Sequence, residues 1–307
     1  MKSLFFNVSK EHYQRSTLLK TKTSHIQKVD ISSGILFFDV TLKGHHDKHI
    51  KVDNFDRLVA ICIVKKGRVS IVEEKKETLL KADEIHLFCS SKQDFTIHIH
   101  EAKESEIFVL FIADFILKRY LSGKAAEPID TLYATTQEDT PLTQINTQPL
   151  DSISLYLVEK IKEDNPESLM QSFVGEQRVM EFMAHRFSLL DIVDKTIDKE
   201  AYEIAKRAKK YLLTHFINPP SIQELARICA TNQTKLKTVF KQVYALTIYA
   251  YIQKLRLEKA NILLKEDSLS IGEIAKKVGY KHQGHFSKLF FESYGIYPKE
   301  LLKVRYC

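Results

Sequence analysis

The sequence lacks the features that mark secreted and membrane proteins. Its four cysteines are scattered and form no CxxC pair, so neither a zinc finger nor a disulfide framework is predicted. No stretch approaches the ~20 apolar residues of a membrane span. The apolar run at the N-terminus is too short for a signal peptide. These absences predict reduced thiols, no membrane association and a cytoplasmic location.

Motifs of known enzyme classes are also missing. The chain has no Gly-rich phosphate loop, no nucleophile elbow and no HExxH, and its carboxylates follow no diagnostic spacing. We therefore predict that the protein is not an enzyme, that it has no catalytic residues and that it uses no cofactor.

Charge is unevenly distributed along the chain, which at 307 residues is long enough for two domains. Residues 201–307 hold 19 Lys and Arg but 8 Asp and Glu, a net charge of +11, whereas the whole chain carries +7. The positive field therefore lies on the last third of the chain. This asymmetry predicts a polyanionic partner for that segment.

The same segment contains a repeat. Ser221-Ile-Gln-Glu-Leu-Ala226 recurs as Ser270-Ile-Gly-Glu-Ile-Ala275, 49 positions later, and the apolar pattern from Leu236 recurs from Phe286, 50 positions later. The change from 49 to 50 puts one extra residue in the turn of the second copy. Each copy has the size of a helix-turn-helix, and two copies favour a paired DNA-reading module over a solenoid.

Each copy is predicted to be a short capped helix, a turn and a longer reading helix. Ser221 and Ser270 are each followed three residues later by Glu, the spacing of a capping box. A continuous helix over 248–264 separates the copies and spans roughly 25 Å at ~1.5 Å per residue. It can hold two reading helices about one DNA turn, ~34 Å, apart. Arg256 and Leu257 are expected to pack this helix against both copies.

The outward residues of the two reading helices are the candidate DNA contacts. In a helix-turn-helix the second helix lies in the major groove, where amide, hydroxyl and ammonium groups reach bases and phosphates. The predicted contacts are Gln233, Thr234, Lys235, Lys237, Thr238 and Lys241 in the first copy, and His282, Gln283, His285, Ser287 and Lys288 in the second.

Residues about 202–305 resemble the DNA-binding domain of the AraC/XylS-type transcription regulators. The most specific part of the resemblance is Ile274-Ala…Val278-Gly-Tyr280…His285-Phe-Ser287. The resemblance implies that one chain reads adjacent major grooves with two helices. Pro219-Pro-Ser-Ile222 and Asn232-Gln-Thr-Lys-Leu-Lys237 are similar to the pyochelin-regulator-like branch of the family, whose known members respond to iron-siderophore compounds.

Three residues depart from the family pattern. Ala245 stands where glycine is usual at the end of the first reading helix, which predicts a strained or rearranged cap. Lys281 replaces a small polar N-cap residue before the second reading helix. Gly284 lies inside that helix and costs roughly 1 kcal/mol relative to alanine.

The first half of the chain is predicted to be rich in strands. From about Asp30 to Ala113, short β-branched and aromatic segments alternate with turns, which is typical of a barrel or sandwich. The polar segment 122–149, with three prolines, is expected to be a loop. Helical periodicity begins at Asp151 and continues in a second helix at about 168–193, and these helices are predicted to be either connectors or a dimerisation pair.

Five histidines in this half are candidate metal ligands. His45, His46 and His49 are close in sequence, and His98 and His100 share one face of a strand. The metal-binding pattern of cupins, with its paired His, Glu and later His, is not recognisable. We therefore predict no metal site and expect these histidines to be solvated or packed.

Together these features predict an α+β multidomain protein. Residues 1–150 would form a cupin-like β-barrel that binds an effector, 151–200 a helical linker or dimerisation region, and 201–307 an all-α tandem helix-turn-helix domain. The cupin-like barrel is what the family resemblance implies.

The predicted function is a sequence-specific transcription regulator, an activator and homodimer, with promoter DNA, an unknown small-molecule effector and RNA polymerase as partners. The alternative is a constitutive DNA-binding protein whose barrel serves only dimerisation, in which case its interior should be filled by side chains. A catalytic cupin is the enzymatic alternative.

Overall fold

The computed structural model divides into two compact units. One comprises Met1–Leu150 and Leu157–Ile192, and the other comprises Asp151–Tyr156 and Val193–Cys307. The region 151–200, predicted as a linker, thus contributes to both units. The structure describes residues 4–5, 13–44, 47–53, 57–73, 76–91, 95–123, 127–138, 142–163, 170–187, 190, 198–265 and 269–303. In these ranges, no helix is both long and apolar enough to span a bilayer.

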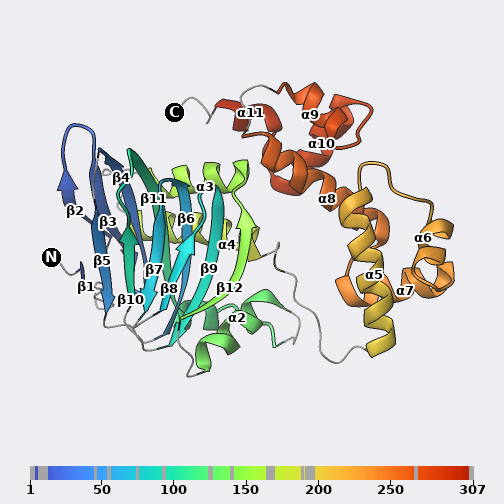
Figure 1. Cartoon of the computed structure of the whole chain (residues 1–307), viewed down its shortest axis with the longest axis horizontal. Helices are drawn as coiled ribbons and strands as arrows, with labels where there is room; N and C mark the ends of the chain where they lie inside the picture. The colour runs from blue at the N-terminus through green and yellow to red at the C-terminus, as the bar shows by residue number, and fades with distance from the viewer. Residues whose placement is uncertain are drawn as a thin grey trace. The chain divides into compact units, whose positions relative to one another are not determined.

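The first unit is built on two β-sheets (Figure 1). The five-stranded sheet has the order β1 (Leu4–Phe5), β5 (Lys48–Asp53), β10 (Phe95–Ile99), β7 (Val69–Glu73) and β8 (Lys76–Leu80). The seven-stranded sheet has the order β12 (Thr143–Pro149), β9 (Glu84–Ser91), β6 (Arg57–Lys66), β11 (Glu104–Ala113), β4 (Ile35–Lys43), β3 (His25–Ser32) and β2 (Gln14–Lys20). Strand β1 runs parallel to β5, and the other neighbours pair antiparallel.

The predicted closed barrel is not confirmed. Strands β1 and β8 end one sheet, and β12 and β2 end the other, so among the described residues each sheet keeps two edges. A continuous ladder of hydrogen bonds around the fold is what defines a barrel. The first unit is therefore an open two-sheet structure in the part of the chain that the structure describes.

The space between the two sheets is filled by apolar side chains. Alternation along the strands directs Leu36, Phe38 and Val40 of β4 to the same core as Ile97 and Ile99 of β10, and all five are buried. The full core cluster draws on strands of both sheets, from Ile26 in β3 to Phe111 in β11. Close packing of this kind is typical of a structural core and leaves little room for a ligand at its centre.

The segment 122–149, expected to be a loop, contains regular structure instead. Helix α2 (Pro128–Gln137) begins with Pro128 in its first turn, and β12 follows. Proline suits this position because its fixed φ matches a helix and its missing N–H would have no intrahelical acceptor there. The prediction that the whole segment 122–149 is a loop was therefore wrong.

Helices cover the outer face of the seven-stranded sheet. Helix α1 (Asp114–Lys118) follows β11, and α3 (Ser152–Lys162) and α4 (Gln171–Phe187) come later in the chain. Helix α4 packs closely on β3, since a Cβ atom added at the buried Gly175 would lie 2.7 Å from Cγ2 of Ile31. Glycine is thus required for this close approach.

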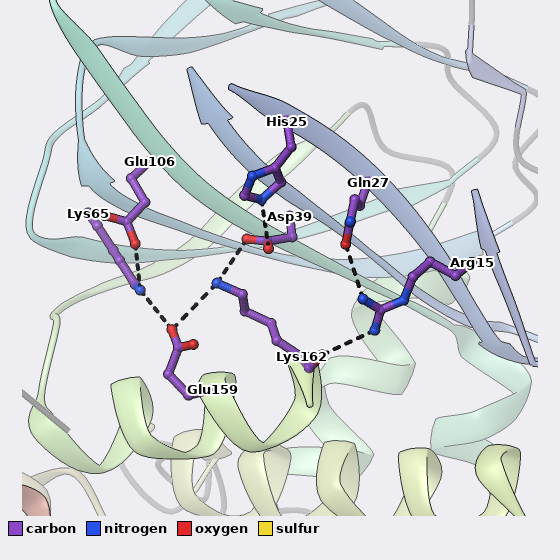
Figure 2. A network of polar contacts seen from close by, with 8 residues as sticks. All are labelled: Arg15, His25, Gln27, Asp39, Lys65, Glu106, Glu159 and Lys162. Atoms are coloured by element: carbon purple, nitrogen blue, oxygen red, sulfur yellow. Dashed lines mark hydrogen bonds and ion pairs between the residues drawn. The ribbon is translucent and has the colours of Figure 1, made fainter. Parts of the chain in front are cut away.

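A network of charged side chains joins the second half of α3 to that sheet (Figure 2). Nζ of Lys65 lies 2.8 Å from Oε1 of Glu106 and 2.9 Å from Oε1 of Glu159. Nζ of Lys162 lies 3.5 Å from Oε1 of Glu159 and 3.1 Å from Oδ1 of Asp39. Each cation therefore has two carboxylate partners.

Three further residues complete this network at the edge of the sheet. Nε2 of His25 lies 3.1 Å from Oδ2 of Asp39. Arg15 of β2 donates to Oε1 of Gln27, at 3.2 Å, and to the backbone carbonyl of Lys162, at 3.1 Å. The last bond satisfies a carbonyl at the C-terminal end of α3, where no intrahelical donor remains.

The charges of the network shift one another's ionisation. Burial alone would raise the pKa of Glu159, but attraction to Lys65 and Lys162 outweighs it and the pKa of Glu159 is lowered. Burial alone would lower the pKa of Lys65, but Glu159 and Glu106 raise the pKa of Lys65 above its ordinary value. The folded state therefore favours both charged forms.

The second unit is helical. Its helices are α5 (Lys199–His215), α6 (Ile222–Ile228), α7 (Gln233–Tyr244), α8 (Ile248–Leu263), α9 (Ile271–Lys277), α10 (Gln283–Tyr294) and α11 (Pro298–Lys303). One core cluster unites α5, α6, α7 and the first half of α8 around residues such as Leu212, Leu236 and Phe240. A second set of buried residues, including Ile274, Phe286 and Phe290, lies in α9 and α10.

The described cysteines agree with the expectation of reduced thiols. Cys62, Cys89 and Cys229 are buried and free. Burial raises the pKa of Cys62 and of Cys89 to about 12. These thiols are therefore protonated and unreactive near neutral pH. Cys307 lies outside the described residues.

The ion-pair network makes the stability of the first unit dependent on pH. We expect Glu159→Gln to lower the free energy of unfolding by about 0.5–1 kcal/mol near pH 7, a small value because the carboxylate is partly exposed to solvent. Since the pKa of Glu159 is lowered on folding, its contribution is complete above the unfolded-state value of ~4.3 and is lost as pH falls through the folded value. Urea unfolding measured between about pH 3 and pH 7 should show the two proteins converging in acid. Glu138→Gln, at an exposed position outside the network, is the control, and a difference that persists unchanged in acid would contradict the assignment.

Candidate nucleic-acid interface

Both helix-turn-helix copies begin with the predicted capping box. The backbone N–H of Glu224 donates to Oγ of Ser221 at 3.2 Å, and the N–H of Ser221 donates to Oε2 of Glu224 at 2.8 Å. The Ser270 and Glu273 pair repeats these bonds at 3.3 and 2.8 Å. Hydrogen bonds from Ser221 lower the pKa of Glu224, and hydrogen bonds from Ser270 lower the pKa of Glu273. The capping boxes are thus confirmed, and they fix where α6 and α9 start.

The turns of the two copies share their hydrogen bonds but differ in length. Ala230 in the first turn (φ 52°) and Gly279 in the second (φ 90°) adopt a left-handed backbone conformation. The next N–H returns to the first helix in both cases, from Thr231 to Ala226 and from Tyr280 to Ala275. The extra residue of the second copy is Lys281, which follows these bonds and precedes α10.

The first reading helix, α7, separates its faces as predicted. Leu236, Val239, Phe240 and Val243 are buried, whereas the predicted contacts Gln233, Thr234, Lys235, Lys237, Thr238 and Lys241 are all exposed. Two of these contacts already have partners. Nζ of Lys235 lies 2.7 Å from Oε1 of Glu200, and Oγ1 of Thr238 donates to the carbonyl of Thr234.

The cap at the end of α7 has the geometry that the sequence suggested. Ala245 adopts φ 55° and ψ 7°, the left-handed conformation that glycine usually takes. A residue with a Cβ atom pays roughly 1–2 kcal/mol in this region. The strained cap predicted at Ala245 is therefore present.

The second reading helix, α10, starts differently from the prediction. Its N-cap residue is His282 rather than Lys281, and the His282 side chain makes no capping hydrogen bond. The reason is the one-residue insertion, which moves the start of the helix by one position. His282 therefore lies at the start of α10 rather than on its outer face.

The other predicted contacts of α10 lie on or near its exposed face. Gln283, His285 and Lys288 are exposed, and Ser287 is half-buried. The ring of His285 meets Tyr280 edge to face at 5.9 Å. Nζ of Lys288 lies 3.8 Å from Oε1 of Glu292, an exposed pair of small energetic weight.

Arg256 of α8 connects the segment between α5 and the first copy with the turn of the second copy. Its Nε donates to the carbonyl of Phe216 and its Nη2 to the carbonyl of Ile217, both at 2.9 Å, beyond the end of α5. Its guanidinium also lies over the ring of Tyr280, 5.5 Å from the centroid. The expectation that Arg256 packs α8 against both copies is confirmed for the second copy, whereas on the other side its partners lie in the segment that leads into the first copy. Leu257, which was named with it, is buried.

Gly279 completes this connection. A Cβ atom there would lie 2.7 Å from the carbonyl oxygen of Ile217 and 3.1 Å from Cζ of Arg256. Tyr280, the next residue, is buried, and burial raises its pKa to about 12. Its hydroxyl has no hydrogen-bond partner within the described chain, so the ring contributes mainly by packing.

Sequence reasoning missed a buried polar cluster at the other end of α8. Oδ1 of Asn261 accepts from the N–H of Ile153 and its Nδ2 donates to Oδ1 of Asp151, both at 2.9 Å. The same Asp151 oxygen accepts from the N–H of Ser154 at 2.8 Å. The cluster caps the first turn of α3, which belongs to the second unit. An asparagine among the apolar residues of α8 was the available signal, because a buried amide needs partners.

Two glycine-to-alanine substitutions test this geometry in opposite directions. We expect Gly279→Ala to destabilise the second unit by roughly 2 kcal/mol, since it adds left-handed strain and a clash with the Ile217 carbonyl. Gly284→Ala should instead stabilise it by up to about 1 kcal/mol, because no atom lies within 4 Å of the added Cβ in α10. Urea unfolding of the full chain, followed by far-ultraviolet circular dichroism, measures both. Equal effects of the two changes would contradict the described turn.

Comparisons with known proteins agree with this geometry. A family model described as "Helix-turn-helix domain" matches residues 225–303. The chain is 26% identical over 171 residues to the HTH-type transcriptional regulator YisR of Bacillus subtilis, covering 51% of this chain and 58% of that protein. It is 32% identical over 117 residues to the HTH-type transcriptional activator RhaR of Mannheimia succiniciproducens, covering 36% and 42%. The chain therefore spans less than two thirds of the length of these relatives.

A solved structure of an AraC-type regulator from Chromobacterium violaceum is 25% identical and covers 35% of this chain and 96% of its own, with a TM-score of 0.33. The matched sequences are those of transcription regulators rather than enzymes. Residues 225–303 are thus similar to helix-turn-helix domains, which agrees with the AraC/XylS-type resemblance seen in the sequence.

Proposed function

We propose that the protein is a sequence-specific transcription regulator that inserts α7 and α10 into adjacent major grooves of promoter DNA. The observation that carries this proposal is the pair of matching polar faces on α7 and α10, which are joined by α8 with its residue Arg256. Each face presents side chains of the kind that bind bases and phosphates. In this proposal the protein is an activator that also contacts RNA polymerase.

The charges of exposed lysines on α7 support the same placement of this helix against DNA. The side chains of Lys237 and Lys241 are exposed, and no carboxylate of the described chain pairs with either. Their charges are therefore available for DNA phosphates, which would release counterions on binding. Lys235 differs, because it must exchange Glu200 for a phosphate and gains less from DNA.

DNA titrations test the proposal and separate two classes of contact. Lys237→Ala and Lys288→Ala should weaken binding to all sequences and reduce the salt slope by about 1 each, because each removes a phosphate contact. Substituting Gln233, Thr234, Gln283 or His285 with alanine should change sequence preference by ~1–3 kcal/mol per lost base contact. Fluorescence anisotropy on the protein's own upstream DNA and on shuffled DNA, at two salt concentrations, measures both effects.

The matched control is Lys259→Ala, which removes an exposed lysine from α8 outside both reading helices. It should leave the salt slope unchanged. If all six reading-helix variants bind as the wild type does, the assigned faces are wrong. If the wild type binds both DNAs equally and only at low salt, the module is a general DNA-coating domain.

Effector binding would fall to the first unit, which we propose acts as the cupin-like module of the regulator. A pocket of about 200 Å³ lies near the edges of the two sheets, where it is lined by Ile71 of β7, Thr78 of β8, Phe88 of β9 and Gln144 of β12. It is smaller than the ~300–1,000 Å³ typical of sites for drug-sized ligands, so it suits a small effector. Lys76 also lines it and supplies a positive charge.

A specific observation favours the alternative function, in which the first unit only dimerises a constitutive DNA-binding protein. The centre between the sheets is filled by side chains, as expected for a structural module. At the start of α4, Met170 and Phe173 are 58% and 64% exposed, although both are apolar. Exposed apolar side chains of this size are typical of interfaces between protein chains.

Dimerisation through α4 can be tested directly. We expect Phe173→Glu to convert a dimer into a monomer, because the new carboxylate would be buried without a partner in the interface. Sedimentation velocity at several protein concentrations reports the change. The control is Tyr249→Glu, which places the same charge at a 72% exposed aromatic residue of α8. A wild type that is monomeric at all concentrations, or a Phe173→Glu variant that remains dimeric, would contradict this role of α4.

A further inference from the structure

Three histidines and two carboxylates gather on the outer face of the five-stranded sheet. His98 and His100 are two residues apart on β10 and therefore share a face, while Ile97 and Ile99 between and beside them point into the core. His49 of β5 lies directly opposite His98 in the strand register. The strand pairing itself thus brings the three imidazoles together.

The first group of these side chains is centred on Asp47. One carboxylate oxygen lies 2.6 Å from Nε2 of His98, and the other lies 3.9 Å from Nε2 of His49. The rings of His49 and His98 are stacked, with their centroids 4.0 Å apart. The ligand atoms of these three residues all lie within 4.8 Å of one another.

The second group shares His98 and adds Glu77 and His100, but its ligand atoms are already engaged. Oγ of Ser70 lies 2.6 Å from Oε1 of Glu77 and 2.8 Å from Nε2 of His100. Ser70 itself is fully buried, which fixes the pair in place. The ring of His100 lies tilted against that of His98, with their centroids 3.8 Å apart.

We propose that this face binds one first-row transition-metal ion through His49, His98 and Asp47. Imidazole nitrogen and carboxylate oxygen are ligands that Zn²⁺ takes at ~2.0–2.2 Å. Ligand atoms of a tetrahedral site at these bond lengths lie ~3.3–3.6 Å apart. The hydrogen bond between Asp47 and His98 must therefore open and the distance from Asp47 to His49 must shorten, and His49 and Asp47 are free to move because their side chains are 38% and 57% exposed. Three protein ligands at a surface leave the fourth position to water.

The site differs from the cupin pattern considered for the sequence, since it lies on the outside of the sheet. It also revises the expectation that these histidines are only solvated or packed; His45 and His46 lie outside the described residues.

Zinc titration of the metal-stripped full-length protein tests the proposal. Isothermal titration calorimetry should show one equivalent of Zn²⁺ bound with a Kd of about 1 µM or tighter. We expect His98→Ala, His49→Ala and Asp47→Asn each to weaken binding at least about tenfold, a ligand-loss effect in the range seen for metal sites. Co²⁺ in place of Zn²⁺ should give visible absorption bands of a low-coordinate site in the wild type and not in these variants.

The controls separate this site from adventitious binding. His215→Ala removes an exposed histidine of the second unit, and His100→Ala removes a neighbour whose ring nitrogen bonds Ser70 rather than a proposed ligand. Both should therefore change the Kd less than about threefold. Because His49 and Asp47 are exposed, their variants should fold, and Zn²⁺ should raise the melting temperature of the wild type but not of these two. The absence of saturable binding, or binding unaffected by His98→Ala, would overturn the proposal. Loss in His100→Ala with retention in His49→Ala would overturn the assigned ligands.

Discussion

The second unit depends on the guanidinium of Arg256. It accepts no hydrogen bonds and can only donate, and it is placed where two backbone carbonyls beyond α5 have no helical donor of their own. The opposite side of the same planar group covers the ring of Tyr280 in the second copy. One side chain therefore satisfies the segment between α5 and the first copy and packs against the turn of the second. Lysine could not replace it, because a point charge cannot both fork between two carbonyls and stack on a ring. Gly279 belongs to the same constraint, since any Cβ there would displace the Ile217 carbonyl that Arg256 holds.

In the first unit, the main constraint is the attachment of α3 to a sheet whose outer face carries charged side chains. Lys65 and Asp39 lie on strands that are largely apolar, and each charge would be costly if left unpaired beneath α3. Glu159 and Lys162 of α3 supply the opposite charges. These ion pairs fix both where α3 lies on the sheet and which of its residues lie opposite each strand. Arg15 adds a bond to the last turn of the same helix. The first turn of α3 is fixed separately by Asn261 and Asp151 in the second unit.

The helix-turn-helix unit could be predicted in detail because its signals are local. A capping box occupies four consecutive residues, and a repeat is found by comparing one part of the sequence with another. Both can therefore be recognised without the tertiary fold. Even the position of the insertion could be placed in the second turn, although the shift of the N-cap from Lys281 to His282 could not. The barrel prediction failed for the opposite reason. Short apolar strands show that sheets form, but whether β2 and β12 pair with further strands depends on contacts between distant residues. The contacts of Asn261 with Asp151 are likewise more than a hundred residues apart in sequence.

The filled interior of the first unit restricts where a ligand could bind. A ligand that entered between the sheets would have to displace close-packed side chains such as Phe38 and Phe111, whose rings already meet at 6.0 Å. Two places avoid that cost: the pocket near Phe88 and the histidine face of β5 and β10. Strand β10 separates these faces, with Ile97 directed to the core and His98 to the surface. A ligand of His98 would therefore act on β10 without opening the core. Any response to it must then come from a differential affinity for two arrangements of the strands, since equal affinity for both shifts nothing.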